Sequence, residues 1–363
     1  MAQELAILSR LGYRAYSEGL YDNAADIYEQ AWQQASEANN DEDVIVSRFW
    51  LAESLRMADQ KVRAVPHYSA VIASRDIAIT AVGRNRVGIA YAGLIDSCMV
   101  LADVDRSALL NTANEGIEWS ERWKCRGALI CLHEMRAGVY RQVGDLTSAI
   151  SDQEKAVAMR RRWAEASGYI LPSLLNNLAL YLQQRGSEND IVRVESVLSE
   201  SLRCHNSNDY TQQWSHHRLA ELYRSLGQWG KAEHHFLEAV MLGRRTQSRA
   251  IVGSLDSLVR LYLDQGNLED AQVYLREAAR CFLKLPSAVT VRERFNLLDS
   301  LSRLREAQAG NGSTKVSRRL RRMARIARER QLRYAQQMDT YDRGRRADRV
   351  KSSLTVLRDA GGT

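Results

Sequence analysis

Residues 219–239 read LAELYRSLGQWGKAEHHFLEA, and residues 258–278 read LVRLYLDQGNLEDAQVYLREA. Both stretches carry small or apolar residues and one turn glycine at the same six positions, at offsets of 3, 7, 12, 16 and 19 from the first. The six positions are Ala220, Tyr223, Gly227, Ala232, Phe236 and Ala239 in the first stretch, and Val259, Tyr262, Gly266, Ala271, Leu275 and Ala278 in the second. Such self-similarity at a fixed spacing indicates a repeated structural unit.

The spacing predicts two antiparallel helices joined by a tight turn. Small residues such as Ala220 and Ala232 allow two helix backbones to approach closely, and the aromatic residues fill the space between neighbouring pairs. Gly227 suits the positive φ that ends a helix. One helix pair cannot bury its own apolar face, so the pairs are expected to stack.

The same spacing recurs in five further units, two of them degenerate, so that we count seven in all. Their second-helix anchors, in chain order through all seven, are Ala24, Ala64, Leu109, Ala149, Val194, Ala232 and Ala271. The unit with Ala64 has Asp59 in place of the turn glycine, and the unit that contains Gly186 has three inserted residues between Gly186 and Val194.

This pattern resembles the tetratricopeptide repeat family over roughly residues 5 to 285. The anchors lie 38 to 45 residues apart, longer than the 34 residues of the standard repeat, so the helices are longer or the linkers looser. Together with LLNNLALYLQQRG at residues 174–186, this looks like the long-period kinesin-light-chain type. The resemblance implies an all-α, right-handed superhelical solenoid of about seven helix pairs, followed by C-terminal helices.

The composition agrees with helix throughout, because the 363 residues include only 3 prolines and 7% aromatic residues. We expect three regions: a repeat array at 1–285, an amphipathic helix and linker at 286–312, and a basic helical extension at 313–363. Residues 311–363 hold 15 Lys and Arg against 5 Asp and Glu, although the whole chain has a net charge of +7. We find no membrane span and no signal peptide, and expect a cytoplasmic protein.

We find no sequence motif of catalysis or cofactor binding, and we predict a protein that is not an enzyme and needs no cofactor or metal. The 5 cysteines are unclustered and expected in the core. Neighbouring histidines of the pairs His216-His217 and His234-His235 point about 100° apart on a helix, so neither pair alone can bind one metal. His217 with His234, across one helix pair, stays open.

In the family that this chain resembles, partners usually lie on the concave face formed by the first helices. We therefore expect a peptide or protein in that groove. Amides would hold its backbone, and arginines would grip acidic groups. The alternative is a solvated helix face whose charges pair with one another. The candidate residues are Arg56, Arg141, Asn176, Asn177, Gln183, His217, Arg224 and Arg260.

The basic stretch RRLRRMARIARERQLRY at 318–334 contains 8 arginines. It also carries one apolar helical stripe, which we expect to dock on the exposed face of the seventh repeat. The stripe consists of Val316, Leu320, Met323, Ala327, Tyr334, Met338 and Tyr341. The arginines are either only solvated or also contact a polyanion; the candidates are Arg318, Arg319, Arg321, Arg322, Arg325 and Arg328.

These observations favour a non-enzymatic adaptor or regulator that binds a peptide segment of a protein partner. The alternative is a nucleic-acid-associated factor whose C-terminal helix contacts phosphates. Self-association stays open, because a repeat array has two ends and this chain shows only one obvious cap.

Overall fold

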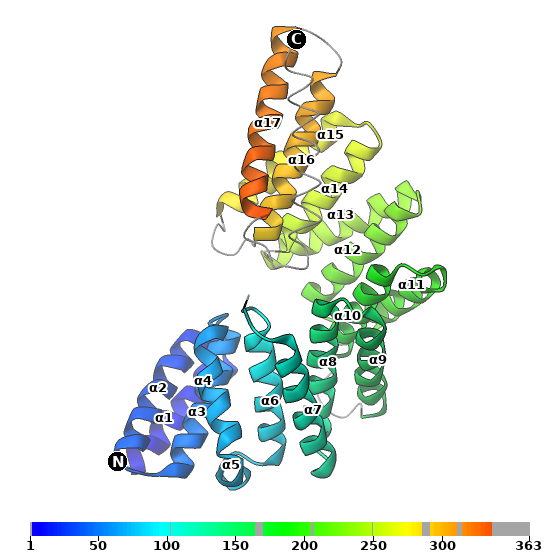
Figure 1. Cartoon of the computed structure of the whole chain (residues 1–363). Helices are drawn as coiled ribbons and strands as arrows, with labels where there is room; N and C mark the ends of the chain where they lie inside the picture. Colours follow the sequence, from blue (N-terminus) through cyan, green and yellow to red (C-terminus); the bar gives the residue numbers. More distant parts are fainter. Residues whose placement is uncertain are drawn as a thin grey trace. The chain divides into compact units, whose positions relative to one another are not determined.

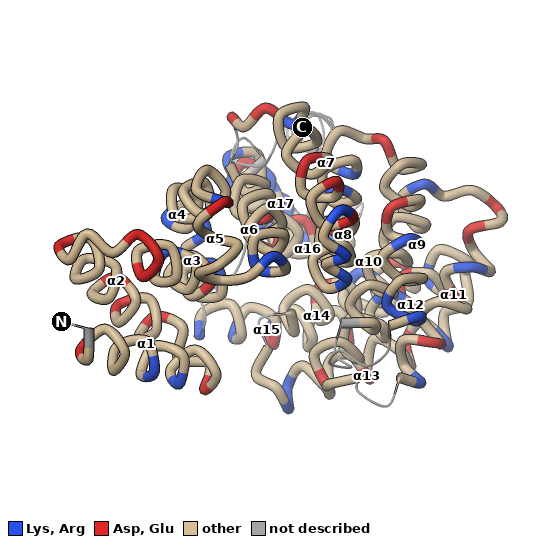
Figure 2. Tube along the Cα trace, turned by 90° about the horizontal axis from the view of Figure 1, so that it is seen from below, with Lys and Arg blue, Asp and Glu red and all other residues tan. Residues whose placement is uncertain are grey.

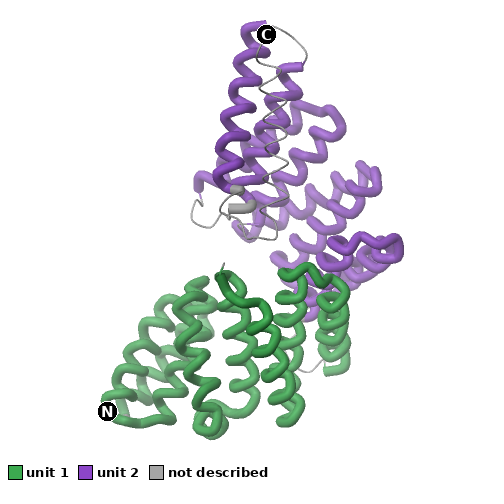
Figure 3. Tube along the Cα trace, in the orientation of Figure 1, with its two compact units in different colours: residues 1–167 green, residues 168–363 purple. Residues whose placement is uncertain are grey.

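The computed structural model describes residues 2–101, 103–163, 170–204, 207–248, 250–284, 291–310 and 314–335. In these residues the chain forms the helices α1 to α17 and no β-strand, which confirms the all-α prediction (Figure 1). The chain divides into two compact units, residues 1–167 and residues 168–363 (Figure 3). None of the described helices is both long and apolar enough to cross a lipid bilayer.

Unit 1 is a stack of antiparallel helix pairs. The first helix of each pair packs on its own second helix, and the second helix packs on the next pair: α2 on α3, α4 on α6 and α7 on α8. The helices are α1 (Ala2–Ser17), α2 (Tyr21–Glu37), α3 (Asp41–Met57), α4 (Lys61–Ala73), α5 (Arg75–Ala81), α6 (Arg84–Cys98), α7 (Arg106–Arg122), α8 (Arg126–Val143) and α9 (Leu146–Arg162).

The four pairs of unit 1 are α1 with α2, α3 with α4, α6 with α7, and α8 with α9. Helix α5 belongs to none of them and packs mainly against α3. This seven-residue helix lies in the linker between the second and third pairs. Its insertion accounts for the spacing of 45 residues between the anchors Ala64 and Leu109.

Unit 2 repeats the arrangement with three pairs of the predicted kind and a fourth, terminal pair. The helices are α10 (Ile170–Arg185), α11 (Glu188–Arg203), α12 (Asp209–Ser225), α13 (Trp229–Thr246), α14 (Ile251–Asp264), α15 (Leu268–Lys284), α16 (Val291–Ala309) and α17 (Lys315–Ala335). With α10/α11, α12/α13 and α14/α15, the described helices contain the seven predicted pairs. The helices of one pair reach 17 and 18 residues in α12 and α13, so the long period comes partly from long helices.

The anchors behave as the spacing predicts. Ala220 and Ala232 are fully buried where α12 and α13 cross, and Phe236 is fully buried beside them. In unit 1, Tyr68 on α4 fills the space against α6 so tightly that a Cβ on Gly93 would lie 2.4 Å from its ring. Each repeat therefore rests on close backbone approach, with a large ring filling the gap to the next pair.

The turns also follow the predicted chemistry. Gly227, between α12 and α13, has a φ of +69°. Asp59, at the equivalent place between α3 and α4, has a φ of +61°. Aspartate is among the few residues other than glycine that enter this left-handed region at low cost, which explains why this unit keeps the spacing without its glycine.

The C-terminal helices form an eighth pair, since α17 packs along α16 and α16 packs on α14 and α15. Leu320, Ala327 and Tyr334 are buried or half-buried on α17. The expected stripe was wrong at Val316 and Met323, which are 67% and 40% exposed. The face that packs consists of Ser317, Leu320, Ala324, Ala327, Arg328, Gln331 and Tyr334, and Met338 and Tyr341 lie outside the described residues.

Candidate functional site

The structure brings four of the predicted groove residues to neighbouring first helices of unit 2. Gln183 lies on α10, His217 and Arg224 lie on α12, and Arg260 lies on α14. Helix α12 contacts both α10 and α14, because first helices of successive pairs stack on one another. We call these residues, with the carboxylates that join them, the polar row of unit 2.

A chain of ion pairs crosses the polar row. Glu221 on α12 accepts from Arg224 Nη2 at 3.0 Å and lies 3.8 Å from Arg260 Nη2. Arg224 continues to Asp264 on α14, with Nη1 at 2.9 Å from the carboxylate, and Arg303 on α16 reaches the same carboxylate at 2.6 Å. The row therefore carries compensated charges, and these arginines are already engaged by the protein's own acids.

Burial and neighbouring charges set the ionisation of the row. Burial favours the neutral acid, but Arg260, His217 and Arg224 outweigh it and hold the pKa of Glu221 at about 2. Burial lowers the pKa of His217 to about 4, so this imidazole is neutral at pH 7. The carboxyl of Asp256 behaves differently from that of Glu221. Its nearly complete burial raises its pKa, although Arg260 Nε lies 3.2 Å away.

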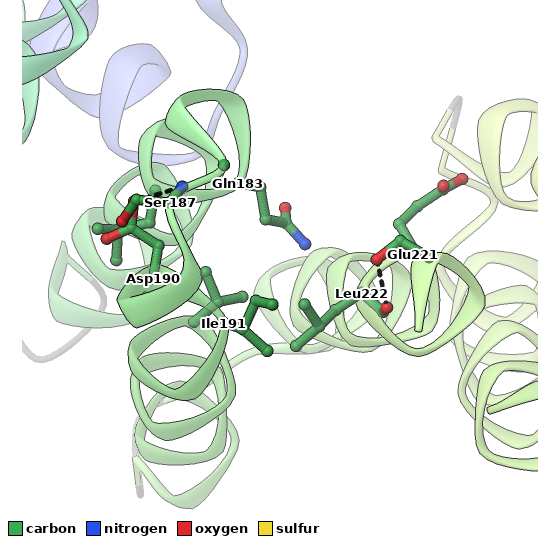
Figure 4. Close-up of a pocket in the computed structure, with 10 residues that line it drawn as sticks. Gln183, Ser187, Asp190, Ile191, Glu221 and Leu222 are labelled. Carbon is green, nitrogen blue, oxygen red and sulfur yellow. Dashed lines mark hydrogen bonds between the residues drawn. The ribbon is translucent and has the colours of Figure 1, made fainter. Parts of the chain in front are cut away.

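A cavity of about 340 Å³ opens beside this row, between α10, α11 and α12 (Figure 4). Its apolar wall consists of Leu182, Ile191, Val194 and Leu222. Gln183, Glu221 and Ser225 are among its polar lining residues; in the figure the Gln183 amide points into the space between α10 and α12, whereas the Glu221 carboxylate points away from it.

The polar groups of this cavity offer mostly acceptors. Gln183 Nε2 donates to the carbonyl oxygen of Arg218 at 3.0 Å, which leaves its Oε1 as an acceptor. The Ser225 hydroxyl donates to the carbonyl of Leu222 at 2.7 Å, which also leaves its oxygen able to accept. With the Gln183 and Ser225 oxygens, the rim suits a ligand that presents N–H donors next to an apolar group.

The turn that forms one edge of the cavity is held by an ion pair between the buried Asp190 and the exposed Arg185. Asp190 caps the start of α11, where its carboxylate accepts from the Ser187 backbone N–H at 3.3 Å and from Arg185 Nε at 2.8 Å. The hydrogen bond from Arg185 is the main reason that the pKa of Asp190 falls to about 2. This edge coincides with the three inserted residues after Gly186, so the break in the repeat spacing was a usable signal for the cavity.

Asn176 does not lie in the groove, which corrects our expectation. Its side chain is buried, and Nδ2 donates to the carbonyl of Pro172 at 3.0 Å and to that of Thr211 at 3.2 Å. Its Oδ1 accepts from the Ser215 hydroxyl at 3.2 Å. Asn176 therefore ties α10 to α12 from inside the core, and its neighbour Asn177 is half-buried on α10.

The two remaining groove candidates, Arg56 and Arg141, belong to unit 1. Arg56 on α3 donates to Glu53 at 2.9 Å and to the Tyr68 hydroxyl at 3.1 Å, and it lies 3.6 Å from Asp96. It borders a second cavity, of about 330 Å³, on the face of α3, α6 and α8. Arg141 is half-buried in the last turn of α8.

Of the six arginines proposed to contact a polyanion, four are exposed and two form contacts within the protein. Arg318, Arg319, Arg322 and Arg325 are exposed on α17. Arg321 is half-buried and donates to the carbonyl of Gly310 at 3.0 Å. Arg328 is buried and forms an ion pair with Asp299, so it cannot meet a polyanion from solution as we had expected.

The histidine pairs make a polar cluster inside one repeat. His216 Nδ1 on α12 lies 2.9 Å from His235 Nδ1 on α13, and the Tyr223 ring stacks on His235. No group of three or more His, Cys, Asp or Glu side chains suited to a metal occurs in the part of the chain that the structure describes.

Figure 2 shows basic and acidic residues interspersed along the helices of both units.

Comparison with known proteins agrees with the helix pairs. Residues 252–285, which comprise α14 and α15, match the tetratricopeptide repeat family. No curated protein matches by sequence. Among solved structures, the apo form of RapI is similar with a TM-score of 0.64 and 11% identity, over 98% of this chain and 97% of that one.

Two further structures are similar along nearly the whole chain. The apo quorum sensor NprR from B. thuringiensis has a TM-score of 0.59 and 12% identity, over 98% of this chain and 99% of that one. A Rap protein complexed with Competence and Sporulation Factor has a TM-score of 0.58 and 14% identity, over 99% and 98%. At these identities the likeness concerns the fold. Residues 252–285 therefore form a tetratricopeptide repeat, and the other helix pairs of the two units share its all-helical, stacked arrangement.

Proposed function

We propose that this chain is a non-enzymatic adaptor or regulator that captures a peptide segment of a protein partner on the first helices of unit 2. The observation that carries the proposal is the cavity between α10, α11 and α12, together with the polar row beside it. An apolar side chain of the peptide enters the cavity, and the peptide backbone lies along the rim.

The chemistry of the cavity supports a peptide. Its volume of about 340 Å³ falls in the range of roughly 300–1,000 Å³ that is typical of ligand sites. Its rim presents the Gln183 and Ser225 oxygens, and peptide N–H groups need such acceptors when they leave water. Because Arg224 and Arg260 are already paired with carboxylates, we propose that they shape the rim and do not grip an acidic side chain.

The fold is consistent with this role. Repeat arrays present extended surfaces for partners. The Rap protein of similar fold was solved in complex with Competence and Sporulation Factor. That complex concerns the Rap protein and not this chain. We extend to this chain only the general role of binding a partner segment, with its residues Gln183, Ile191 and Ser225 as the contacts.

The test is selection from a random peptide phage library against the full chain, followed by affinity measurement of the enriched peptides. Ile191→Trp fills the cavity, whereas Val192→Trp adds the same ring at a neighbouring position that is 72% exposed. We expect the first variant to weaken peptide binding at least tenfold and the second to leave it unchanged. Circular dichroism melting verifies that both variants fold.

Gln183→Leu is the second arm, because it keeps the side-chain volume and removes the acceptor. We expect about a fivefold loss of affinity, corresponding to one hydrogen bond of about 1 kcal/mol. Enriched peptides that bind the Ile191 and Val192 variants equally well would show that the cavity is not the site.

A second function, contact with a polyanion through α17, is favoured by one observation. Arg318, Arg319, Arg322 and Arg325 are exposed on one helix, and only Arg325 has a carboxylate within ion-pair distance among the described residues, Glu329 at 3.7 Å. Binding of a single-stranded DNA probe should weaken steeply between roughly 50 and 200 mM salt and disappear when the four arginines are changed to glutamine. Equal binding by that variant would exclude α17.

A further inference from the structure

A further cavity of unit 1 lies beside α5, the helix that belongs to none of the repeated pairs. Its volume of about 330 Å³ falls in the range of roughly 300–1,000 Å³ that is typical of small-molecule sites. It is lined by Arg75 of α5, by Tyr91 of α6, and by Glu115, Glu118, Trp119 and Arg122 of α7. Because the inserted helix supplies Arg75, a repeat without that insertion would lack one wall of this cavity.

Tyr91 is the most deeply buried residue of this lining, with 4% of its surface exposed. Its hydroxyl forms no hydrogen bond with any residue that the structure describes. Burial raises the pKa of Tyr91, while the charge of Arg75 lowers it and that of Glu115 raises it. Both charges therefore act on the hydroxyl at close range, which places this group beside Arg75 and Glu115. A buried hydroxyl without a partner is costly, and this one is a protonated donor at pH 7.

The charged groups of the lining are two arginines and two glutamates, and they do not pair with one another. All four are exposed, and none forms an ion pair within the described part of the chain. The Arg122 guanidinium lies 5.4 Å from the centroid of the Trp123 ring, so Arg75 is the cation that has no such neighbour. In contrast to the polar row of unit 2, this cavity offers both signs of charge to a ligand at once.

The residues of α7 set the direction in which a ligand extends. Glu115, Glu118, Trp119 and Arg122 lie on one face of the helix, at steps of three, four and seven residues from the first. Trp119 Nε1 donates to the carbonyl of Arg84 at 3.2 Å, so Trp119 offers a ligand only its ring. The charged end of a ligand therefore belongs beside Tyr91, Arg75 and Glu115, and its apolar part belongs along α7 beside Trp119.

The balance of charges limits the kind of ligand. A simple anion would meet Glu115 and Glu118, and a simple cation would meet Arg75 and Arg122. A zwitterion carries both charges on one small group, and each of its charges finds a partner in this lining.

We propose that this cavity binds a free amino acid with an aromatic side chain. The carboxylate of the ligand accepts from the Tyr91 hydroxyl and pairs with Arg75, and the ammonium group pairs with Glu115. The aromatic side chain packs against the Trp119 ring. The proposal does not rest on the peptide cavity of unit 2, since the two cavities share no lining residue.

The experiment is isothermal titration calorimetry of the full chain with L-phenylalanine at pH 7 and low salt. Two compounds with the same ring are the matched ligand controls: 3-phenylpropanoate lacks the ammonium group, and phenethylamine lacks the carboxylate. We expect L-phenylalanine to bind at least tenfold more tightly than either control, because a hydrogen bond to a charged group contributes about a factor of ten or more.

Two variants assign the two charges separately. Arg75→Gln should weaken the binding of L-phenylalanine about tenfold and leave phenethylamine binding no weaker. Glu115→Gln should weaken L-phenylalanine to a similar extent and leave 3-phenylpropanoate binding no weaker. Glu121→Gln is the matched protein control, since Glu121 is exposed on α7 and does not line the cavity. It should leave the affinity for all three compounds unchanged.

Tyr91→Phe tests the buried hydroxyl alone, because it keeps the ring. We expect about a fivefold loss of affinity for L-phenylalanine. The melting temperature of this variant without ligand should not fall, since the hydroxyl has no described partner to lose.

Equal affinities for the three compounds would overturn the proposal, and so would equal losses in the Glu115 and Glu121 variants. Binding of either control as tightly as L-phenylalanine would identify a simple anion or cation site instead. Absence of saturable binding up to about 10 mM L-phenylalanine would also overturn it, since a ligand of this size with two charge-assisted contacts should bind below that concentration.

Discussion

Two arginines of α17 that are three residues apart should differ sharply in their effect on stability. Arg328 is buried, with a side chain 6% exposed, and Arg325 has a side chain 47% exposed. Changing either one to methionine removes one positive charge and keeps a long, unbranched side chain. Any difference between the variants therefore reports the surroundings of the two positions and not the net charge.

The size of the difference follows from the partners. Arg328 pairs with Asp299, whose side chain is 15% exposed, and lies 3.5 Å from Glu306 and 3.1 Å from Gln331 Oε1. Arg328→Met leaves the Asp299 carboxylate mostly buried without its cation, which costs about 3 kcal/mol. Arg325→Met breaks a half-exposed pair with Glu329 at 3.7 Å, which is worth about 0.5 kcal/mol or less.

Urea denaturation followed by circular dichroism at 222 nm measures the loss of stability. Hydrogen exchange of residues 315–335 shows whether the loss is confined to the α16/α17 pair, because repeat arrays can open locally. We expect the Arg328 variant to unfold at clearly lower urea and to exchange faster in α17. Free energies of unfolding that agree within about 0.5 kcal/mol for the two variants would refute the assignment of Arg328 to the interior.

Three further outcomes follow from the packing. Gly93→Ala should destabilise the chain by about 1–3 kcal/mol in thermal melting, since its Cβ would lie 2.4 Å from the Tyr68 ring, whereas Gly230→Ala, with open space around it, should be neutral or stabilising. Gln213→Leu should raise the free energy of unfolding by about 1 kcal/mol, because Gln213 is 1% exposed and neither polar atom of its amide has a hydrogen-bond partner among the described residues; a lower melting temperature would contradict this. Burial lowers the pKa of three histidines to about 4; they are His216, His217 and His235. The unfolded chain then binds more protons than the folded chain, so the stability present above pH 6.5 should fall as the pH drops from 6.5 towards 4, and urea midpoints that stay constant from pH 7 to 5 would refute the burial.

The repeat spacing predicted the helices and their pairing. Ala220, Ala232 and Phe236 are buried as expected, and Gly227 and its substitute Asp59 both take the positive φ of the turn. These features depend on neighbours within about twenty residues, which a helical period of 3.6 residues and a fixed turn relate directly. Helix α5 escaped prediction because it lies in the linker, where the repeat imposes no residue type.

Predictions about single side chains on those helices were less secure. A shift of one residue turns a side chain by about 100° around the helix axis, which separates a core position from a surface one. Asn176 was placed in the groove and lies in the core, Met323 was placed in the core and is 40% exposed, and Arg328 was placed at the surface and is buried. The amide of Asn176, the thioether of Met323 and the guanidinium of Arg328 are each found at buried and at exposed helix positions. The residue type therefore did not show whether each side chain would be buried or exposed.

The sequence alone determined the all-helical repeat, seven of the eight helix pairs and the basic character of the C-terminal helix. The tertiary structure decided which charges neutralise one another and where the cavities open. Arg224 is 40 residues from Asp264 and meets it because first helices of successive pairs stack, and the cavity beside Gln183 depends on how far α11 stands from α12. These distances arise from the packing of several helices at once, whereas the repeat spacing encodes only the contacts within a pair and to the next one.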